Sequence, residues 1–472
     1  MQNLTLTLHP GSSREPLYVQ IYQAVIEEIR NGHLRAGEKL PSKKQLCTHL
    51  GLSQTTVENA YEMLLTEGYI SSIPRSGYYV LDAALPPPAP DAPGAEKEQP
   101  IQKEEASQVP DIRYSLASST VDISGFPFTT WAKISKEVTY NSPELLSPGP
   151  SEGDLILRDT LNRYLREFRG VHTDSSCIII GAGTEYLLGL LSRILSDHHT
   201  FAIENPCYMR VCHNLTDNGK EIAPVQVNAD GICLEKLAAS KADVVYITPS
   251  HQYPTGVTMP IGARLKLLEW AKASTRRYII EDDYDSEYRF SGKPIPSLQS
   301  LDTSGKVIYL GTFSRSIAPS IRIAYMILPP DLMIVYRTHF DYCAPTVSRF
   351  EQHTLERFIS GGHYTRNLNR TRTLYKRRRD GFLQLMKNHW NHKKYAIYGD
   401  NLGLHFLLLI RNGMNESELK KKSADCGLIL KALSEYYIEG APEYPVFLIN
   451  YTGFHYEQAE EIIRLLKDAW AL

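Results

Sequence analysis

The sequence lacks several features that would by themselves define a class of protein. Its 472 residues contain no apolar run as long as a membrane span, and residues 1–10 alternate polar and apolar side chains without the basic and apolar segments of a signal peptide. Its seven cysteines include no C-x-x-C pair, which argues against a disulfide framework and a zinc site and fits a reducing compartment. We therefore expect a cytoplasmic protein with no membrane partner and no metal.

The chain also lacks an excess of charge of either sign. It has 51 basic and 53 acidic residues, which gives a formal net charge of −2. Residues 1–80 hold seven of each, so any affinity of this part for nucleic acid must come from local arrangement and not from bulk charge.

One composition shift divides the chain. Residues 85–100 are rich in Pro, Ala and charged side chains and cannot bury a core, so we predict a flexible linker over residues 81–110. A length of 472 residues also favours more than one domain. We predict a small module at residues 10–80 and a body at residues 111–472, with a smaller lobe from about residue 364 onward.

The small module has the pattern of three helices and a hairpin. Apolar side chains recur every four positions over residues 17–29, which predicts the first helix. Ser42 and Gln45 have the spacing of a capping box at the start of a second, short helix that a glycine ends. Ser53 can cap a third helix with one apolar face, and residues 69–80 have the pattern of strand, turn and strand. This order predicts a winged helix-turn-helix.

In a winged helix-turn-helix, the N-terminal residues of the last helix enter the major groove of double-stranded DNA. Glutamine can pair with adenine there, and serine, threonine and lysine can bind phosphates. The predicted DNA-binding residues are Lys39, Ser42, Lys43, Lys44, Ser53, Gln54, Thr55, Thr56 and Arg75. The alternative is a small helical interaction domain whose lysines face solvent, and for any single lysine it is the better explanation.

The body alternates short apolar runs with helical stretches. The predicted buried strands lie at residues 177–180, 200–203, 244–247, 278–280 and 307–310. Helical patterns at residues 184–195 and 263–273 lie between them. This rhythm predicts an α/β fold, a mostly parallel sheet with helices on both faces. In such sheets, ligands bind at the carboxyl ends of the strands.

Polar motifs follow these strands, and together they match the needs of one cofactor. Pyridoxal phosphate requires a phosphate cup, a carboxylate at the ring nitrogen, a donor at the ring oxygen, a stacking partner and a lysine. A glycine turn at a helix start and an arginine suit the phosphate, and Asp282 suits the ring nitrogen. Tyr284 is the predicted donor and Tyr208 the predicted stacking partner. The predicted cofactor-binding residues are Gly183, Thr184, Tyr208, Tyr253, Asp282, Tyr284, Thr312, Ser314, Arg315 and Arg322.

Each motif also has a purely structural explanation. Glycine turns before helices are common, and an acidic strand end such as residues 281–283 can simply face solvent. Tyr208 can be a core residue, and His251 in the loop after the third strand is more often a structural hydrogen-bonding group than a catalyst. The cofactor hypothesis therefore depends on the set and not on any one member.

These motifs resemble two known families. Four segments look like the N-terminal domain of GntR-type regulators: residues 37–42, 50–57, 67–70 and 76–80. The order of the body motifs is similar to that of fold-type I, class I aminotransferases. Residues 248–256, 281–287 and 311–314 look like signatures of the MocR/GabR subfamily of GntR regulators, which joins both parts. The resemblance implies a head-to-tail homodimer that acts as a transcription factor and senses an amino acid or vitamin B6.

The sequence departs from that subfamily at the cofactor lysine, where it has Arg315. A Schiff base requires a neutral amine, and arginine stays protonated at any working pH. Chemistry therefore excludes an internal aldimine at residue 315, and we predict no transaminase activity and no catalytic residue. An engineered replacement at this position stays an alternative.

Two further departures concern recognition. The family usually has arginine where Gln54 stands and favours it where Lys44 stands, so the operator cannot be carried over. Aminotransferases present an arginine for the substrate carboxylate from a C-terminal strand, and residues 447–454 contain none. Arg210 is the candidate substitute for binding the carboxylate of an effector.

Three outcomes stay open for the body. It binds pyridoxal phosphate without a covalent bond, or it binds a preformed cofactor–amino acid adduct or pyridoxamine phosphate, or it has kept the scaffold and lost the cofactor. We prefer them in that order. The rival hypotheses are an active aminotransferase that carries a DNA-binding module, and a dimeric scaffold with no ligand.

Overall fold

The computed structural model describes residues 15–82, 112–117, 122–290 and 295–472. The chain divides into two compact units, one on each side of the first gap. The predicted linker at residues 81–110 lies almost entirely outside the described residues and stays a prediction, as do residues 10–14 of the predicted small module.

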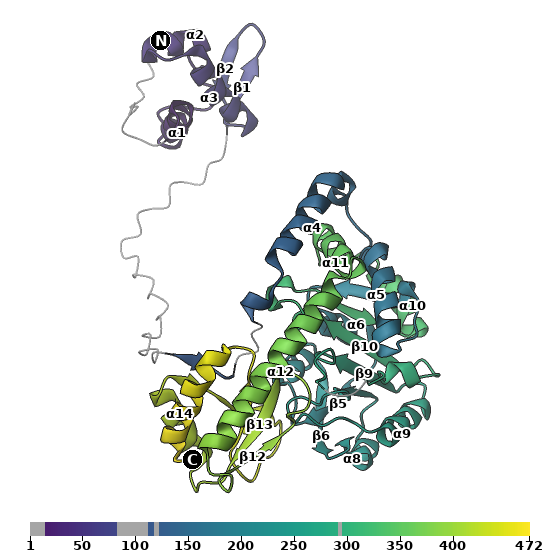
Figure 1. The fold of residues 1–472 in the computed structure, drawn as a ribbon. Coiled ribbons are helices and arrows are strands. Elements are labelled where there is room, and N and C mark those ends of the chain that lie inside the picture. The colour runs from purple at the N-terminus through teal and green to yellow at the C-terminus, as the bar shows by residue number, and fades with distance from the viewer. Residues whose placement is uncertain (1–14, 83–111, 118–121, 291–294) are drawn as a thin grey trace. The chain divides into compact units, whose positions relative to one another are not determined.

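The small unit is a three-helix bundle with a two-stranded wing (Figure 1). Its elements are α1 (Leu17–Arg30), α2 (Lys43–Leu50), α3 (Gln54–Thr66), β1 (Ile70–Ile73) and β2 (Gly77–Val80). The strands are antiparallel, with Ile70 opposite Val80. Buried side chains from all three helices and both strands, such as Ile21, Leu46 and Leu64, form one core.

Local chemistry sets the limits of α2 and α3. The Ser42 hydroxyl accepts a hydrogen bond from the Gln45 backbone and the Gln45 side chain accepts one from the Ser42 backbone, the predicted capping box. Gly51 ends α2 in the left-handed conformation, with φ of 66°, which a residue with a side chain adopts only at a cost. Ser53 caps α3 through the Thr56 backbone N–H. The helix-turn-helix expectation is therefore confirmed in its details.

The large unit is built on an eight-stranded sheet covered by helices (Figure 1). In spatial order the strands are β4 (Ile178–Gly181), β11 (Ala324–Ile327), β10 (Val307–Thr312), β9 (Tyr278–Asp283), β8 (Val244–Ile247), β5 (Thr200–Asn205), β6 (Glu221–Asn228) and β7 (Gly231–Ile232). The five strands from β10 to β6 are parallel. β11 runs antiparallel to both of its neighbours, and β7 runs antiparallel to β6.

Strand alternation explains the two hydrophobic layers that enclose this sheet. Val244 and Tyr246 of β8 belong to one buried cluster, and Val245 and Ile247 belong to another. Successive strand residues point to opposite faces, so a continuous apolar run serves both layers. The helices of this unit before the C-terminal lobe are α4 (Phe128–Asn141), α5 (Leu155–Arg169), α6 (Thr184–Ile194), α7 (Met209–Asp217), α8 (Leu234–Ala239), α9 (Ile261–Lys272), α10 (Pro330–Phe340) and α11 (Arg349–Ser360).

The C-terminal part forms a second, smaller sheet. Its antiparallel strands are, in order, β12 (Tyr395–Tyr398), β13 (His405–Ile410), β16 (Val446–Asn450) and β15 (Lys431–Ala432). The helices around it are α12 (His363–His389), α13 (Glu416–Asp425) and α14 (Ala459–Trp470), and α12 packs along α14 (Figure 1). A short parallel pair joins β3 (Tyr114–Ser115) to β14 (Leu428–Ile429).

The α/β fold is as predicted, with all five expected strands present. Sequence reasoning missed three strands of the large sheet, β6, β7 and β11. Of these, β11 lies between β4 and β10 although it follows both in the chain. Among the described residues, no helix is both long and apolar enough to span a bilayer.

Candidate functional site

The candidate site is a cavity of about 140 Å³ at the carboxyl edge of the large sheet. On the same measure a single water needs roughly 10–15 Å³, so the space suits a small organic ligand. The segments that follow β4, β5, β8, β9 and β10 converge on it, because the carboxyl ends of these strands meet at one edge. The predicted residues that line it are Thr184, Tyr208, Arg210, Tyr253, Asp282, Tyr284, Thr312, Ser314, Arg315 and Arg322.

Asp282 lies in β9 at the floor of this cavity. Its Oδ2 accepts a hydrogen bond from the Tyr246 hydroxyl of neighbouring β8. Its Oδ1 is buried and has no hydrogen-bond partner among the described residues. Burial, helped by the charges of Asp283 and Asp285, raises the pKa of Asp282 to about 7. This oxygen is therefore suited to a cationic or N–H donor group of a ligand.

The start of α6 forms another part of the cavity wall. Gly183 precedes the helix with φ of 93°, and a Cβ at this position would lie 2.4 Å from Nη2 of Arg322. Only glycine lets the guanidinium lie this close to the backbone. A helix N-terminus beside an arginine is an anion site in chemical terms, because both carry positive charge.

Thr312 and Ser314 add hydroxyl groups to the cavity wall. Thr312 ends β10, and its Oγ1 accepts a hydrogen bond from the backbone N–H of Ser314 at 3.1 Å. Arg322 stands in the left-handed conformation with φ of 54°, and its guanidinium lies against Gly183. Glycine turn, hydroxyls and guanidinium, predicted separately from the sequence, are thus brought together.

Aromatic side chains line the remaining walls. The ring of Tyr253 meets those of Tyr208 and Tyr284 edge to face, with centroids 5.6 and 5.7 Å apart. The hydroxyl of Tyr284, predicted as a donor to a ligand, lies 2.9 Å from Nδ1 of His251. The same nitrogen lies 2.9 Å from a carboxylate oxygen of buried Asp285. His251 is thus a structural hydrogen-bonding group, and it already engages the Tyr284 hydroxyl.

Arg315 follows β10 and lies on the boundary of two cavities. It lines the main cavity and a smaller one that also includes His405 and Asn450. Its positive charge lowers the pKa values of Asp282 and Tyr284, although burial raises both overall. Asn450 ends β16, in the C-terminal segment at residues 447–454 that contains no arginine.

Sequence reasoning missed five polar residues of the cavity, which are Glu185, Glu204, Asn214, Tyr246 and Thr248. Glu204 accepts hydrogen bonds from the backbone and hydroxyl of Thr248 at 3.0 and 2.8 Å. Burial raises the pKa of Glu204 to about 7. Strand alternation was a usable signal for Tyr246 in β8 and Thr248, which follows the strand two residues later and continues the same face.

Arg210 and Glu185 are joined by an ion pair at the cavity mouth. Nη1 of Arg210 lies 3.0 Å from Oε1 of Glu185, and the arginine side chain is 68% exposed. Cys207, in the same loop, lies with its sulfur 3.3 Å from that of Cys212, and both are free thiols. The scattered cysteines of the sequence thus include one close pair.

The predicted DNA-binding residues lie on the helix-turn-helix and its wing. Lys39, Lys44, Thr55 and Arg75 are exposed. Several of the others already make contacts within the unit. Gln54 donates to Glu58 at 3.0 Å.

Further contacts within the small unit define the surface that α2, α3 and the wing present. Nζ of Lys43 lies 5.7 Å from the ring centroid of Tyr78 in the wing. The Ser53 hydroxyl contacts the Thr56 hydroxyl at 2.7 Å. Arg75 adopts φ of 64° at the tip of the wing. The predicted DNA-binding residues thus lie on or beside α2, α3 and the wing. Two of them, Ser42 and Ser53, also serve as helix caps.

Two features define the class of protein. A winged helix-turn-helix is a DNA-binding module, and the sheet with its pocket is the architecture of an aminotransferase. Residues 17–80 match the bacterial regulatory proteins of the gntR family, and residues 116–438 match the aminotransferases of class I and II. The chain belongs to the MocR-type family of HTH-type transcriptional regulators, in which the two are fused.

Relatives extend over both units. The uncharacterized HTH-type transcriptional regulator YdeL of Bacillus subtilis is 38% identical over 97% of each chain. The HTH-type pyridoxine biosynthesis transcriptional regulator PdxR of Corynebacterium glutamicum is 29% identical over 93% of this chain and 92% of its own. The protein is accordingly a DNA-binding transcriptional regulator.

The fold of the large unit is also that of solved aminotransferases. Pyrococcus horikoshii kynurenine aminotransferase, in complex with PMP, superposes with a TM-score of 0.66 over 76% of this chain and 91% of its own. The sequences are 24% identical, so this likeness concerns the fold.

Proposed function

We propose that the aminotransferase-like unit senses pyridoxal phosphate, or its adduct with an amino acid, without a covalent bond to the protein. One observation carries the proposal. The buried Oδ1 of Asp282, which has no hydrogen-bond partner among the described residues, lies in the same pocket as the helix start at Thr184, while residue 315 is an arginine. The first two fit a pyridine ring and its phosphate, and the third removes the covalent anchor.

Each predicted residue then has a binding role. Asp282 accepts a hydrogen bond from the protonated ring nitrogen, and the Tyr246 hydroxyl donates to its second oxygen and holds it in place. The start of α6 and Arg322 bind the phosphate, with Thr312, Ser314 and Thr184 as further donors. The cofactor, when bound, supplies an electron-withdrawing ring.

Recognition of the effector involves the pocket mouth. Tyr208 is 36% exposed there and can cover one face of the ring, while Tyr253 and Tyr284 close the wall behind it. Arg210 binds the carboxylate of an amino acid effector. The name of the relative PdxR, a regulator of pyridoxine biosynthesis, supports a B6 compound as the ligand class.

The unit is proposed to bind and not to catalyse. Transamination needs a group that moves a proton at the reacting carbon, and the guanidinium of Arg315 does not give up a proton at working pH. The rival is an aminotransferase that carries a DNA-binding module. Turnover of any amino donor with a keto acid by the purified protein would establish that rival.

Binding is proposed to act through a homodimer on an operator in double-stranded DNA. A ligand shifts the affinity for DNA only as far as it binds one arrangement of the protein better than another. The resemblance to the MocR/GabR subfamily supports a head-to-tail dimer. Light scattering behind gel filtration tests the dimer, and a monomer at micromolar concentration with and without ligand would refute it.

The decisive experiment compares the natural protein with Arg315→Lys and Asp282→Asn during titration with pyridoxal phosphate. Calorimetry should show binding by the natural protein and a loss of at least tenfold in Asp282→Asn, the cost of about 1.4 kcal/mol for one charged hydrogen bond. Absorption should show a new band in Arg315→Lys alone, because its amine can bond the aldehyde. Equal heats for the natural protein and Asp282→Asn would refute the ring site.

A further inference from the structure

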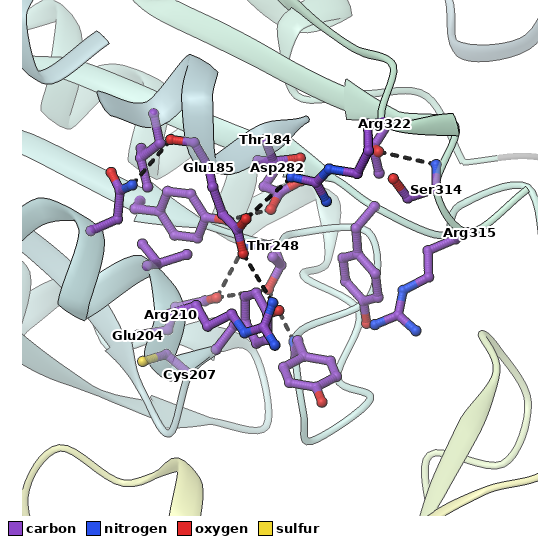
Figure 2. A pocket seen from close by; sticks show the side chains of 18 residues that line it. Thr184, Glu185, Glu204, Cys207, Arg210, Thr248, Asp282, Ser314, Arg315 and Arg322 are labelled. Atoms are coloured by element: carbon purple, nitrogen blue, oxygen red, sulfur yellow. Dashed lines mark hydrogen bonds and ion pairs between the residues drawn. The ribbon is translucent and has the colours of Figure 1, made fainter. Parts of the chain in front are cut away.

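One acidic side chain lies at the point where the proposed ligand would place its negative charge. Glu185 belongs to the first turn of α6, directly after Thr184. Its Oε2 lies 3.2 Å from Nη2 of Arg322, and its Oε1 lies 3.0 Å from Nη1 of Arg210. Figure 2 shows the carboxylate between the two guanidinium groups.

A phosphate bound in the cup would share one partner, Arg322, with this carboxylate. Arg322 lies against Gly183 at the start of α6, so a phosphate held there would meet Glu185 on the same turn. Two anions at such short range repel each other, and they compete for one guanidinium. Glu185 therefore opposes the binding that the rest of the cup favours.

The ion pairs of Glu185 are weak enough for a ligand to replace them. The side chains of Arg210, Glu185 and Arg322 are 68%, 43% and 48% exposed, and ion pairs at such exposure contribute little to stability. A glutamate side chain at this exposure has room to rotate toward solvent. A ligand anion can therefore displace the Glu185 carboxylate from Arg322 at a small cost in free energy. The same movement takes the carboxylate away from Arg210.

We propose that Glu185 is an internal substitute for the ligand's anionic groups, and that its displacement releases Arg210 for a second one. The site then selects ligands that carry two acidic groups, a phosphate for Arg322 and a carboxylate for Arg210. This inference rests on the proposed function and specifies its ligand as the cofactor–amino acid adduct in preference to the cofactor alone.

The test measures the dissociation constants of two ligands by calorimetry on the full-length protein at low salt. Pyridoxamine 5′-phosphate offers the phosphate alone, and an N-(5′-phosphopyridoxyl) amino acid offers phosphate and carboxylate. Glu185→Gln keeps the size of the side chain and removes the charge. The matched control is Glu269→Gln, another exposed glutamate in an ion pair, with Lys272 on α9.

We expect Glu185→Gln to bind pyridoxamine 5′-phosphate about two- to fivefold more tightly than the natural protein does, and to gain still more affinity for the adduct. The gain should shrink as salt screens the charges, and Glu269→Gln should bind as the natural protein does. Unchanged or weaker binding by Glu185→Gln would show that the carboxylate orients the arginines, which overturns the inference.

Two other outcomes of this titration separate a failure of the inference from a failure of the proposed function. An equal gain for both ligands would confine the displacement to Arg322 and refute the release of Arg210. If neither ligand binds the natural protein or either variant, the proposed function fails, and this inference fails with it.

Discussion

The buried carboxyl of Asp282 should make the stability of the large unit depend on pH in a way that asparagine removes. In the folded protein the pKa of Asp282 is raised from 3.8 to about 7, chiefly by burial. The folded state therefore holds this proton more tightly than the unfolded state. The stabilisation that the proton brings is complete below the unfolded pKa and is lost as the pH rises to about 7.

The magnitude follows from the width of that window. A tenfold difference in proton affinity between the folded and unfolded states corresponds to about 1.36 kcal/mol, so the whole effect is roughly 4 kcal/mol, and about 3 kcal/mol of it falls between pH 5 and pH 8. Asparagine has no proton to lose and keeps an oxygen for the Tyr246 hydroxyl. When the pH is raised from 5 to 8, the free energy of unfolding of Asp282→Asn should thus increase by up to about 3 kcal/mol relative to that of the natural protein.

Urea unfolding at the two pH values, followed by tryptophan fluorescence, measures this difference. The four tryptophans are Trp131, Trp270, Trp390 and Trp470, so the signal reports the large unit. Asp230→Asn, a change at an exposed carboxylate between β6 and β7, is the matched control. The reasoning is refuted if the difference in unfolding free energy between Asp282→Asn and the natural protein is the same at pH 5 and pH 8.

Three further predictions concern the small unit. Leu64→Ala removes a fully buried side chain and should destabilise the unit by about 2–5 kcal/mol, seen as faster hydrogen exchange in α1 and α3. Gly51→Ala places a side chain at φ of 66° and should lower the stability of the small unit by about 1 kcal/mol, again measured by hydrogen exchange. Lys44→Ala should weaken binding to all DNA sequences alike and reduce the salt slope by about one, whereas Gln54→Ala should relax the preference at one base pair and leave the slope unchanged. Unaltered exchange rates, or a salt slope that changes with Gln54 and not with Lys44, would contradict these assignments.

Much of the site could be predicted because the fold makes distant motifs converge. Residues such as Asp282, Thr312 and Thr184 each follow or end a strand, and the carboxyl ends of parallel strands share one edge. The caps at Ser42 and Ser53 were predictable for a simpler reason: the hydrogen bonds join residues three apart in the chain.

The missed features depend on pairings between distant parts of the chain. Tyr246 contacts Asp282 only because β8 lies beside β9, and the sequence does not state strand order. Glu185 bridges Arg210 and Arg322, which are 25 and 137 positions away, through the rotamers of three long side chains. Residues 323–328 form a continuous apolar run like those of the predicted strands, so β11 itself could have been predicted. Its position between β4 and β10 could not, because the sequence does not state strand order.

Arg315 removes the lysine but still places a positive charge beside the carboxylates of the pocket. Asp282, Asp283 and Asp285 lie close together in this part of the molecule, and a neutral residue 315 would leave them with less compensation. Burial raises the pKa of Asp282 overall, but the positive charge of an arginine at residue 315 acts against that rise and favours the ionised form that a protonated ring nitrogen needs. Arginine removes only the nucleophile. On the function proposed above, occupancy of the pocket then follows the ligand concentration relative to the dissociation constant, which a regulator can use as a signal.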